Sequence, residues 1–451
     1  MSDFLPWRVV HLELSKGARA LPSEPGGGAF LLFWWRGMLL GHSAIPASQL
    51  PLTATQVEQL AVNKITPTVG GVLFEHGFKP PLPPLPTPPL DDKPCNLGEL
   101  LATTHPMAAL EAQHSLAKQQ AAQAKESVSL VICTRDRPDD LQRCLASLHH
   151  LTRRPDQVIV VDNAPRDQRT RQLVAGHPDI EYVLEAQPGL SRARNAGIAC
   201  CRGDIIAFTD DDVIVHPDWL LGMLHGFDKP DVQAVTGPIL PAELETESQL
   251  LFQLADEDTS WGHQRLLFDA GFFAATQGKG APVWHIGAGA NMAFRREVFE
   301  QVGLFDDRLG AGASGCSEDS EMWYRILAEG GECRYEPTAL VFHVHRSDLS
   351  ALNHQMHQYM RGHVAALLMQ WERYGHRGNV YRALGALPLW YGQQALHWAL
   401  RGGKPRPTTL GRQITGCIAG LLFFWKHRRP RHQARHLNAT PSTKFGGTRL
   451  P

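Results

Sequence analysis

The chain has 451 residues, which is too long for one ordinary domain and predicts two or three. Apolar residues make up 43% and charged residues 20%, so we expect a well-packed core. The formal net charge of −1 indicates no partner by itself, but the charge is unevenly distributed. No Asp or Glu follows Glu372, whereas Lys and Arg continue to the end, and such a basic segment suits either anionic membrane lipid or nucleic acid.

The cysteines and the apolar segments bear on the cellular compartment. The eight cysteines form no C-x-x-C pair, and a chain this long is no small secreted scaffold, so we expect free thiols in a reducing compartment. The first residues show no basic stretch followed by an apolar one, so we expect no signal peptide. The apolar run Gly416–Trp425 is well short of the roughly 20 residues that span a bilayer. We therefore expect a cytoplasmic protein.

Residues 1–79 predict a small α/β domain. Residues 8–14 alternate as a strand does, residues 30–40 resemble a hairpin, and residues 55–62 predict a short helix. No catalytic pattern is visible in this domain.

Residues 80–126 predict a linker followed by a helix. Eight prolines between Lys79 and Pro94 indicate an extended, stiff linker. Residues 104–125 are rich in Ala, Gln, Leu and Lys, which favours a helix that leads into the next domain.

From Ser127 the pattern changes to strands that alternate with helices, which predicts βαβ units and a mainly parallel sheet. Strands are expected at 128–133, 157–161, 180–185 and 204–208, and helices at 139–149, 168–175 and 190–201. Polar residues follow three of these strands, at 134–137, 162–163 and 210–212. Because parallel strands end at one edge of a sheet, we expect a nucleotide to lie along that edge.

The run Asp210-Asp211-Asp212 directly follows the short buried strand at 204–208. Carboxylates packed this closely repel one another, and a divalent cation between them removes much of that cost. The run therefore predicts a metal site at the mouth of the sheet, and the alternative is a solvated acidic turn.

The segment from Ser127 to about Arg346 resembles the family 2 glycosyltransferases, which have the GT-A fold. The stretches that carry the resemblance are Ser129–Pro138, Val160–Asn163, Ala193–Gly197, Phe208–Val213, Gly289–Arg296, Gly303–Asp306 and Ser317–Asp319. The resemblance implies an α/β fold with a Rossmann-like mixed sheet over residues 127–348. The small N-terminal α/β unit precedes it, and a helical, basic region at 349–451 follows it.

The resemblance implies a nucleotide-diphospho-sugar donor, namely a UDP-, dTDP- or GDP-sugar. Asp162 matches the residue that holds the base or ribose, and a carboxylate can accept hydrogen bonds from ring N–H and hydroxyl groups. The residues expected to contact the donor are Thr134, Arg135, Arg137, Asp162, Arg194, Asn195, Asp210 and Asp211.

The resemblance also implies a bound Mg²⁺ or Mn²⁺ ion, since both suit oxygen ligands and a diphosphate. Asp212 matches the metal ligand, Asp210 would contact the ribose or sugar and is also a candidate metal ligand, and Asp211 stands behind them, although the triple run leaves this register open. His343 matches a histidine that helps to bind the metal or diphosphate. The ion would act as a Lewis acid on the leaving nucleoside diphosphate.

A second acidic element, Ser317–Glu321, opens a predicted helix with Ser317 as its N-cap. Acidic residues in a first turn also favour the helix dipole, which is the structural alternative. The resemblance implies that Asp319 is the general base on the acceptor hydroxyl, with Asn291 and Glu318 on the acceptor side. Transfer with inversion requires such a base opposite the leaving group.

The C-terminal region, 349–451, predicts a long helix at 350–374 and two apolar, aromatic stretches at 384–400 and 414–425 that are flanked by Arg and Lys. We interpret it as an amphipathic region in peripheral contact with the cytoplasmic face of a membrane. The alternative is a helical cap on the catalytic domain.

The leading hypothesis is an inverting, metal-dependent glycosyltransferase in cell-surface glycan or polysaccharide synthesis, with a glycan or lipid-linked acceptor and no nucleic-acid partner. One alternative is a sugar-phosphate nucleotidyltransferase, but the loop Cys133–Asp136 lacks the glycines expected after the first strand. Another is a non-catalytic sugar-nucleotide-binding protein, which would have no need of the acidic pair at 318–319.

Overall fold

The computed structural model describes residues 4–23, 26–75, 106–257, 263–400 and 409–429. The chain divides into two compact units, one of residues 1–124 with 240–265 and one of residues 125–239 with 266–451. The predicted proline-rich linker between Lys79 and Pro94 lies outside the described residues. The sequence divided the chain into consecutive segments and did not indicate that residues 240–265 group with the N-terminal unit.

The first unit is built on a three-stranded sheet in the order β1-β2-β3. β1 (Arg8–Glu13) pairs with β2 (Ala29–Trp35) in parallel, and β2 pairs with β3 (Met38–Ile45) as an antiparallel hairpin. The predicted strand and hairpin are confirmed. Arg36 and Gly37 form the turn with φ of 45° and 82°, which is the conformation that two-residue hairpin turns require.

Helices complete the first unit, and β2, whose seven residues are all buried, runs through its core. These helices are α1 (Ala54–Glu75), α3 (Pro106–Ala122) and α8 (Glu247–Glu257). The predicted helix at 55–62 was too short. Val57, Ala61, Ile65 and Val69 are all buried at helical spacing, so the apolar side of α1 continues well beyond residue 62.

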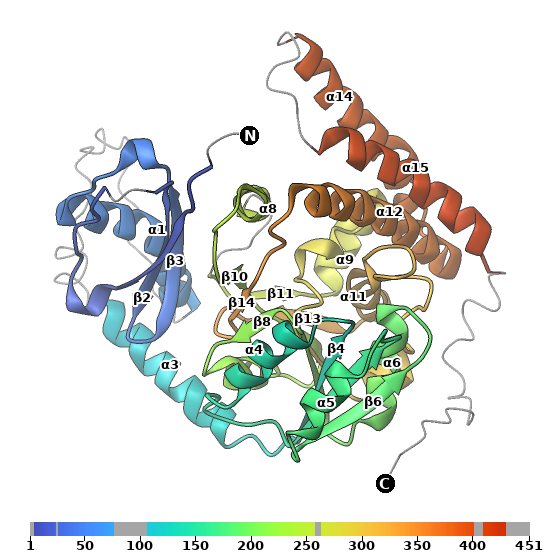
Figure 1. The fold of residues 1–451 in the computed structure, drawn as a ribbon, viewed down its shortest axis with the longest axis horizontal. Coiled ribbons are helices and arrows are strands. Elements are labelled where there is room, and N and C mark those ends of the chain that lie inside the picture. The colour runs from blue at the N-terminus through green and yellow to red at the C-terminus, as the bar shows by residue number, and fades with distance from the viewer. Residues whose placement is uncertain (1–3, 24–25, 76–105, 258–262, 401–408, 430–451) are drawn as a thin grey trace. The chain divides into compact units, whose positions relative to one another are not determined.

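The second unit contains an eight-stranded mixed sheet in the order β11-β13-β9-β12-β7-β4-β5-β6 (Figure 1). Its strands are β4 (Val128–Thr134), β5 (Gln157–Asn163), β6 (Ile180–Glu185), β7 (Ile205–Asp210), β9 (Val232–Thr236), β11 (Leu266–Phe268), β12 (Asn291–Arg295) and β13 (Glu332–Tyr335). β7, β4, β5 and β6 are parallel, as predicted, whereas β12 runs antiparallel between β7 and β9. The predicted α/β fold class with a mixed sheet is confirmed.

Helices and short elements connect these strands. The helices are α4 (Pro138–Leu148), α5 (Arg169–Ala175), α6 (Leu190–Cys200), α7 (Trp219–Gly226), α9 (Ala270–Thr276), α10 (Val298–Gln301) and α11 (Glu318–Ala328). Two short strands, β8 (Val213–Val215) and β14 (Val341–His343), pair antiparallel, and β10 (Ile239–Pro241) lies where the chain passes between the units. The single-turn elements are η1 (Leu14–Lys16), η2 (Ala47–Gln49), η3 (Gln277–Lys279) and η4 (Val283–His285).

The strand register brings the polar strand ends together. β4 is buried along its whole length, which explains its continuous apolar sequence. At its end Thr134 pairs with Asp162 of β5, and Cys133 pairs with Asp210 of β7. The prediction that these polar residues share one edge of the sheet is therefore confirmed.

The C-terminal region of the second unit is helical, as predicted. It comprises α12 (Leu349–Tyr374), α13 (Arg377–Tyr381), the π-helical turn η5 (Arg382–Ala386), α14 (Leu387–Leu400) and α15 (Leu410–His427). α15 packs closely along α12, because a Cβ on Gly416 or Gly420 would lie 2.4 or 2.6 Å from a carbonyl oxygen of α12. Among the helices that the structure describes, none combines the length and apolar character that a membrane span requires.

The cysteines of the described residues are all free thiols, as the sequence predicted.

Candidate active site

The three carboxylates at the acidic strand end, those of Asp210 to Asp212, lie in different surroundings. Asp211 is fully buried, accepts a 2.7 Å hydrogen bond from the Thr134 hydroxyl and pairs with Arg137 at 2.8 Å. Burial raises the pKa of Asp211 to about 7 despite the guanidinium beside it. Its oxygens are engaged inside the protein, which agrees with a place behind the other two carboxylates and leaves Asp210 and Asp212 to face a ligand.

Asp212 lies between two cationic groups. Its carboxylate pairs with Arg137 at 2.6 Å and with Nε2 of His343 at 3.2 Å. Burial alone would raise the pKa of Asp212, but His343 and Arg137 together hold it well below its usual range. Conversely, Asp212 raises the pKa of His343 although burial opposes this. Of the three carboxylates, Asp212 is the one whose pKa is held below its usual range, so it is ionised at neutral pH, whereas burial raises the pKa of Asp210 and of Asp211.

His343 is oriented by a second histidine. The predicted period of two is confirmed, since Nδ1 of His343 lies 2.7 Å from Nδ1 of His345. Burial lowers the pKa of His345 to about 3, so His345 is neutral, and the two Nδ1 atoms share one hydrogen bond. This hydrogen bond leaves Nε2 of His343 directed at Asp212. Such outer partners are what fix the ring of a metal-binding histidine.

These residues fit a divalent cation in part. Within the described residues, no three His, Cys, Asp or Glu side chains form a ready-made metal cluster. However, the 3.2 Å between Asp212 and His343 is close to the separation of about 3 Å between adjacent ligands of an octahedral ion with bonds of 2.0–2.1 Å. Mg²⁺ is commonly held by one or two carboxylates with the remaining ligands from phosphate and water. Asp212 and His343 suit this arrangement, whereas Asp210 lies toward Arg194.

Arg194 of α6 connects the acidic strand end with the second acidic element. The guanidinium contacts Glu318 at 2.5 Å, Asp210 at 3.6 Å and the Gly289 carbonyl oxygen at 3.2 Å. Only 2% of its surface is exposed, and it lies 5.5 Å from the centre of the Phe305 ring. The predicted contact with the diphosphate therefore requires correction: Arg194 is enclosed and holds other residues in place.

The second acidic element begins α11. Asp319 is half-buried and accepts hydrogen bonds from the Gly289 N–H at 2.7 Å and from the Ser320 N–H at 2.6 Å. These bonds fix the carboxylate that the sequence identified as the base. Ser317 occupies the predicted N-cap position, but it is left-handed with φ of 70° and its side chain caps nothing.

Glu318 differs from its predicted place on the acceptor side. Its side chain is buried against Arg194, and burial raises its pKa to about 7 although the guanidinium opposes this. The two neighbouring acids therefore differ in burial: the Glu318 side chain faces inward to Arg194, whereas the Asp319 side chain remains partly accessible.

Both predicted asparagines have structural roles. Asn195 exchanges two hydrogen bonds with the backbone of Phe305, and so ties α6 to the loop before α11. Asn291 is fully buried and accepts from the Trp219 indole, while its amide donates to two carbonyl oxygens. Its hydrogen-bonding groups are thus engaged, and the predicted acceptor contact of Asn291 is wrong.

Among the predicted donor-side residues, Asp162 leaves one buried oxygen without a partner among the described residues, and Arg135 and Arg137 keep part of their surface exposed. Asp162 is buried at the end of β5, where one oxygen accepts from the Tyr182 hydroxyl at 2.9 Å and the other has no hydrogen-bond partner among the described residues. Burial raises its pKa. The side chains of Arg135 and Arg137 are almost half exposed, and that of Arg137 pairs with Asp211 and Asp212. The sequence missed Tyr182, because only the pairing of β5 with β6 brings it to Asp162.

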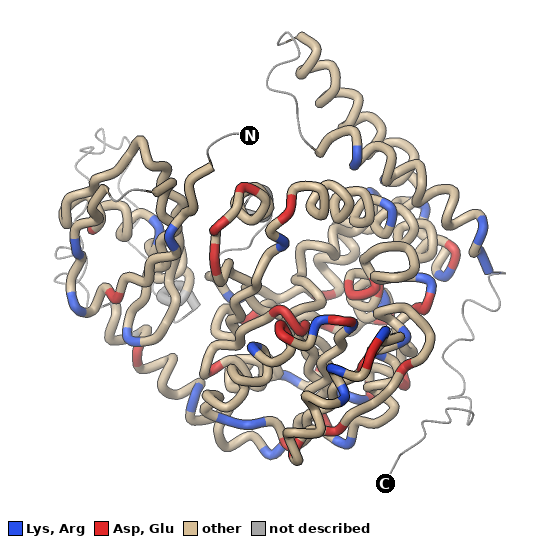
Figure 2. Tube along the Cα trace, viewed as in Figure 1, with Lys and Arg blue, Asp and Glu red and all other residues tan. Residues whose placement is uncertain are grey.

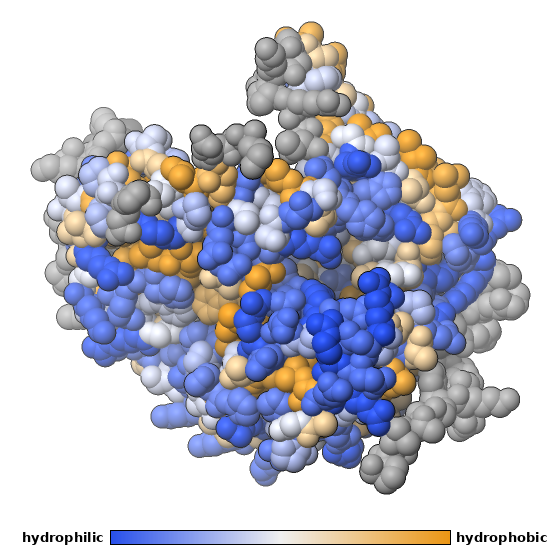
Figure 3. Space-filling view, in the orientation of Figure 1, coloured by the Kyte–Doolittle hydropathy of each residue, from blue (hydrophilic) through white to orange (hydrophobic). Residues whose placement is uncertain are grey.

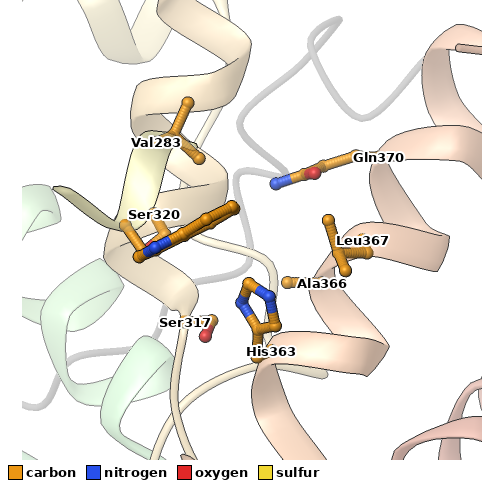
Figure 4. Close-up of a pocket in the computed structure, with 8 residues that line it drawn as sticks. Val283, Ser317, Ser320, His363, Ala366, Leu367 and Gln370 are labelled. Atoms are coloured by element: carbon orange, nitrogen blue, oxygen red, sulfur yellow. The ribbon is translucent and has the colours of Figure 1, made fainter. Parts of the chain in front are cut away.

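A small cavity of about 10 Å³ adjoins the start of α11 (Figure 4). Ser317 and Ser320, which flank the acidic pair, line it from one side, and His363 and Gln370 of α12 line it from the other. Burial lowers the pKa of His363 to about 3, so a neutral imidazole faces this space. Helix α12 is thereby part of the surroundings of the candidate base.

A mixed sheet with polar side chains gathered where its parallel strands end defines an α/β protein with a nucleotide-type binding edge. Residues 129–303 match the model described as glycosyl transferase family 2. The resemblance seen in the sequence is therefore confirmed.

Two relatives each match about half of the chain. It is 31% identical over 224 residues to the pre-mycofactocin glycosyltransferase of Mycobacterium tuberculosis, which covers 49% of this chain and 43% of that protein. It is 29% identical over 226 residues to the succinoglycan biosynthesis protein ExoM of Rhizobium meliloti, which covers 48% of this chain and 65% of that protein. The chain thus spans less than two thirds of the length of these relatives.

Among solved structures, the chain resembles the mannosyltransferase PcManGT from Pyrobaculum calidifontis in complex with GDP-Man and Mn²⁺, with a TM-score of 0.48 and 18% identity over 71% of this chain and 98% of that one.

Proposed function

We propose that this protein is a glycosyltransferase that moves a sugar from a nucleotide-diphospho-sugar to an acceptor hydroxyl with inversion, in cell-surface glycan or polysaccharide synthesis. The observation that carries the proposal is the position of Arg194, whose guanidinium contacts both Asp210 and Glu318. The donor-side strand end and the base-bearing helix are thereby held within the reach of one side chain. The family of residues 129–303 and the names of the relatives support the same activity.

On the donor side, the unpartnered oxygen of Asp162 would accept a hydrogen bond from the base or ribose, because it is buried without a partner. Arg135 and Arg137 would line the nucleotide. We propose Asp212 and His343 as protein ligands of a Mg²⁺ or Mn²⁺ ion. When bound, such an ion would supply charge neutralisation to the leaving diphosphate.

On the acceptor side, Asp319 would take the proton of the attacking hydroxyl while the bond from the anomeric carbon to the diphosphate oxygen breaks. The hydrogen bonds from the backbone of Gly289 and Ser320 hold the carboxylate in place for this step. A general base in such a position contributes about 10²–10⁴-fold. The acceptor would be a glycan or a lipid-linked sugar, and we extend the proposal to peripheral contact with a membrane.

Two alternatives remain to be separated by experiment. A sugar-phosphate nucleotidyltransferase would release pyrophosphate from a nucleoside triphosphate, whereas a glycosyltransferase releases a nucleoside diphosphate. A non-catalytic binding protein would have no need of Asp319.

The test begins with nucleotide sugars, screened by the rise in melting temperature and by metal-dependent hydrolysis. Asp319→Asn should lower transfer by at least about 10²-fold and leave the thermal shift by the donor in place. Glu329→Gln, an exposed acid just past the other end of the same helix, is the control. Unchanged turnover in Asp319→Asn would refute the assignment of the base, and the absence of any thermal shift would refute the donor class.

A further inference from the structure

Helix α14 exposes an unusual amount of apolar surface. Leu389, Trp390, Leu396 and Leu400 are between 48% and 76% exposed, and α14 contains no charged residue. Only Leu387 and Tyr391 of this helix are buried. Most of the apolar surface of α14 is therefore exposed, and an exposed apolar surface of this kind indicates an interaction site.

Helix α15 has a buried side and an apolar exposed side. Gly416, Gly420 and Phe424 are buried against α12. On the opposite side, Ile418, Leu422 and Trp425 are 54%, 67% and 58% exposed at helical spacing. α15 is thus already anchored by one side, so its second apolar side is not required for packing on α12.

Helix α14 contacts α15 (Figure 1), so we consider the exposed apolar residues of the two helices as one set. We call it the outer face, and it consists of Leu389, Trp390, Leu396, Leu400, Ile418, Leu422 and Trp425. Figure 3 shows the apolar strip that runs along this part of the molecule.

Basic residues flank the outer face, and acidic ones are absent. After Glu372 the sequence has fourteen Lys and Arg residues and no Asp or Glu. Figure 2 shows the described part of these two helices without acidic residues, and with basic ones toward the ends of α15. Arg412 lies near its start, Lys426 near its end, and Arg428 follows with its guanidinium 5.0 Å from the centre of the Trp425 ring.

We propose that the outer face of α14 and α15 docks in the plane of an anionic phospholipid bilayer, with its apolar residues at the acyl boundary and its basic residues among the headgroups. The described helices include no membrane span, so an in-plane position is the one open to them. Charge decides against a second copy of this chain as the occupant, since two copies of the same face would bring basic groups together.

Docking would place a lipid-borne acceptor on the same side of the second unit as α12. The opposite side of α12 contacts the loop before Asp319, because a Cβ on Gly362 would lie 2.6 Å from the backbone of Cys316. Helices α15 and α12 therefore both lie between the outer face and the loop that leads to the candidate base. This part of the inference rests on the proposed function, whereas docking itself does not.

The experiment is co-sedimentation of the full chain with phosphatidylcholine vesicles, with and without phosphatidylglycerol, in the absence of nucleotide and acceptor. We expect binding to the phosphatidylglycerol vesicles that weakens with added salt. Because neither substrate is present, a failure here leaves glycosyl transfer unaffected, and a failure of transfer leaves this result unaffected.

Two pairs of variants identify the face. Leu422→Glu with Trp425→Glu should abolish binding, whereas Leu116→Glu, at an exposed leucine of α3, should retain it. Lys426→Gln with Arg428→Gln should weaken binding by about thirtyfold, since each basic side chain near the surface contributes about fivefold. Lys229→Gln with Lys279→Gln, two exposed lysines of the second unit, should leave it unchanged.

Because the changed side chains are exposed, every variant should keep the melting temperature of the unchanged protein. The proposal fails if folded protein ignores the vesicles, if it binds equally with and without phosphatidylglycerol, or if the double glutamate variant binds as before. It also fails if light scattering shows a dimer that Leu422→Glu with Trp425→Glu converts to a monomer.

Discussion

Removal of the Arg194 guanidinium tests how the two acidic elements are held together. Arg194→Met keeps the length of the side chain but takes away the positive charge beside Glu318, which is 4% exposed. The pKa of Glu318 is already raised to about 7 by burial, with the guanidinium opposing that rise. Without the guanidinium the pKa of Glu318 should rise further.

The size of the effect depends on pH. A carboxyl whose pKa is raised on folding loses stability as pH rises from its unfolded toward its folded pKa. In the unchanged protein the loss of stability that comes from Glu318 ends near pH 7, whereas in Arg194→Met this loss continues to higher pH. We expect the variant to be less stable by about 2 kcal/mol at about pH 6, from the lost hydrogen bond to Gly289 and the lost contacts. Above pH 7, the difference in the free energy of unfolding between the unchanged protein and the variant should grow by up to about 1.4 kcal/mol per pH unit. It should approach the roughly 3–5 kcal/mol that is typical of a broken buried pair.

The assay is urea unfolding followed by tryptophan fluorescence at about pH 6 and about pH 8.5. The double variant Arg194→Met with Glu318→Gln should lose the additional destabilisation at the higher pH, because no charge is then left without a partner. If the single variant is destabilised equally at both pH values, or if the double variant behaves as the sum of two independent changes, the pairing of Arg194 with Glu318 does not hold the site together.

Three further predictions follow from buried contacts and from the candidate metal ligands. Asn291→Ala should lower the free energy of unfolding by about 3 kcal/mol, because two buried carbonyl oxygens and an indole N–H lose their partner; a loss under 1 kcal/mol in urea unfolding would contradict this. Gly362→Ala should destabilise by about 1–3 kcal/mol, since its Cβ would meet backbone at 2.6 Å. Gly392→Ala in α14, with nothing within 4 Å, should instead stabilise by about 0.5–1 kcal/mol; equal effects would refute the close packing. Mg²⁺ or Mn²⁺ with a nucleoside diphosphate should raise the melting temperature, and Asp212→Asn should remove the metal-dependent part of that rise; a rise that persists in the variant would exclude Asp212 as a ligand.

The sequence was sufficient for the four parallel strands β4, β5, β6 and β7 and for the grouping of their polar ends, but it did not indicate β9, β11, β12 and β13. Continuous apolar runs such as 128–134 are what buried parallel strands require, and the alternation with helices indicated the strand direction. Since parallel strands end at one edge, the approach of Thr134, Asp162 and Asp210 followed without knowledge of the packing. The spacing of two between His343 and His345 likewise predicted a shared face.

The direction of individual side chains was decided only by tertiary packing. Arg194 and Asn291 carry polar groups that suit a ligand, and nothing local in the sequence distinguishes a side chain that meets substrate from one that pairs inside. The structure distinguishes them because Arg194 is enclosed by Glu318 and Phe305, whereas Asn291 is enclosed by Trp219, and these partners lie far apart in the chain.

The sequence by itself determined which residue types could carry the chemistry, because local patterns set strands, helices and their ends. Only the tertiary structure decided that Glu318 faces inward while the adjacent Asp319 stays partly accessible, and that α15 packs on α12 through glycines and leaves Ile418, Leu422 and Trp425 exposed. The physical reason is that burial and charge pairing depend on residues distant in sequence, whose approach no local pattern encodes.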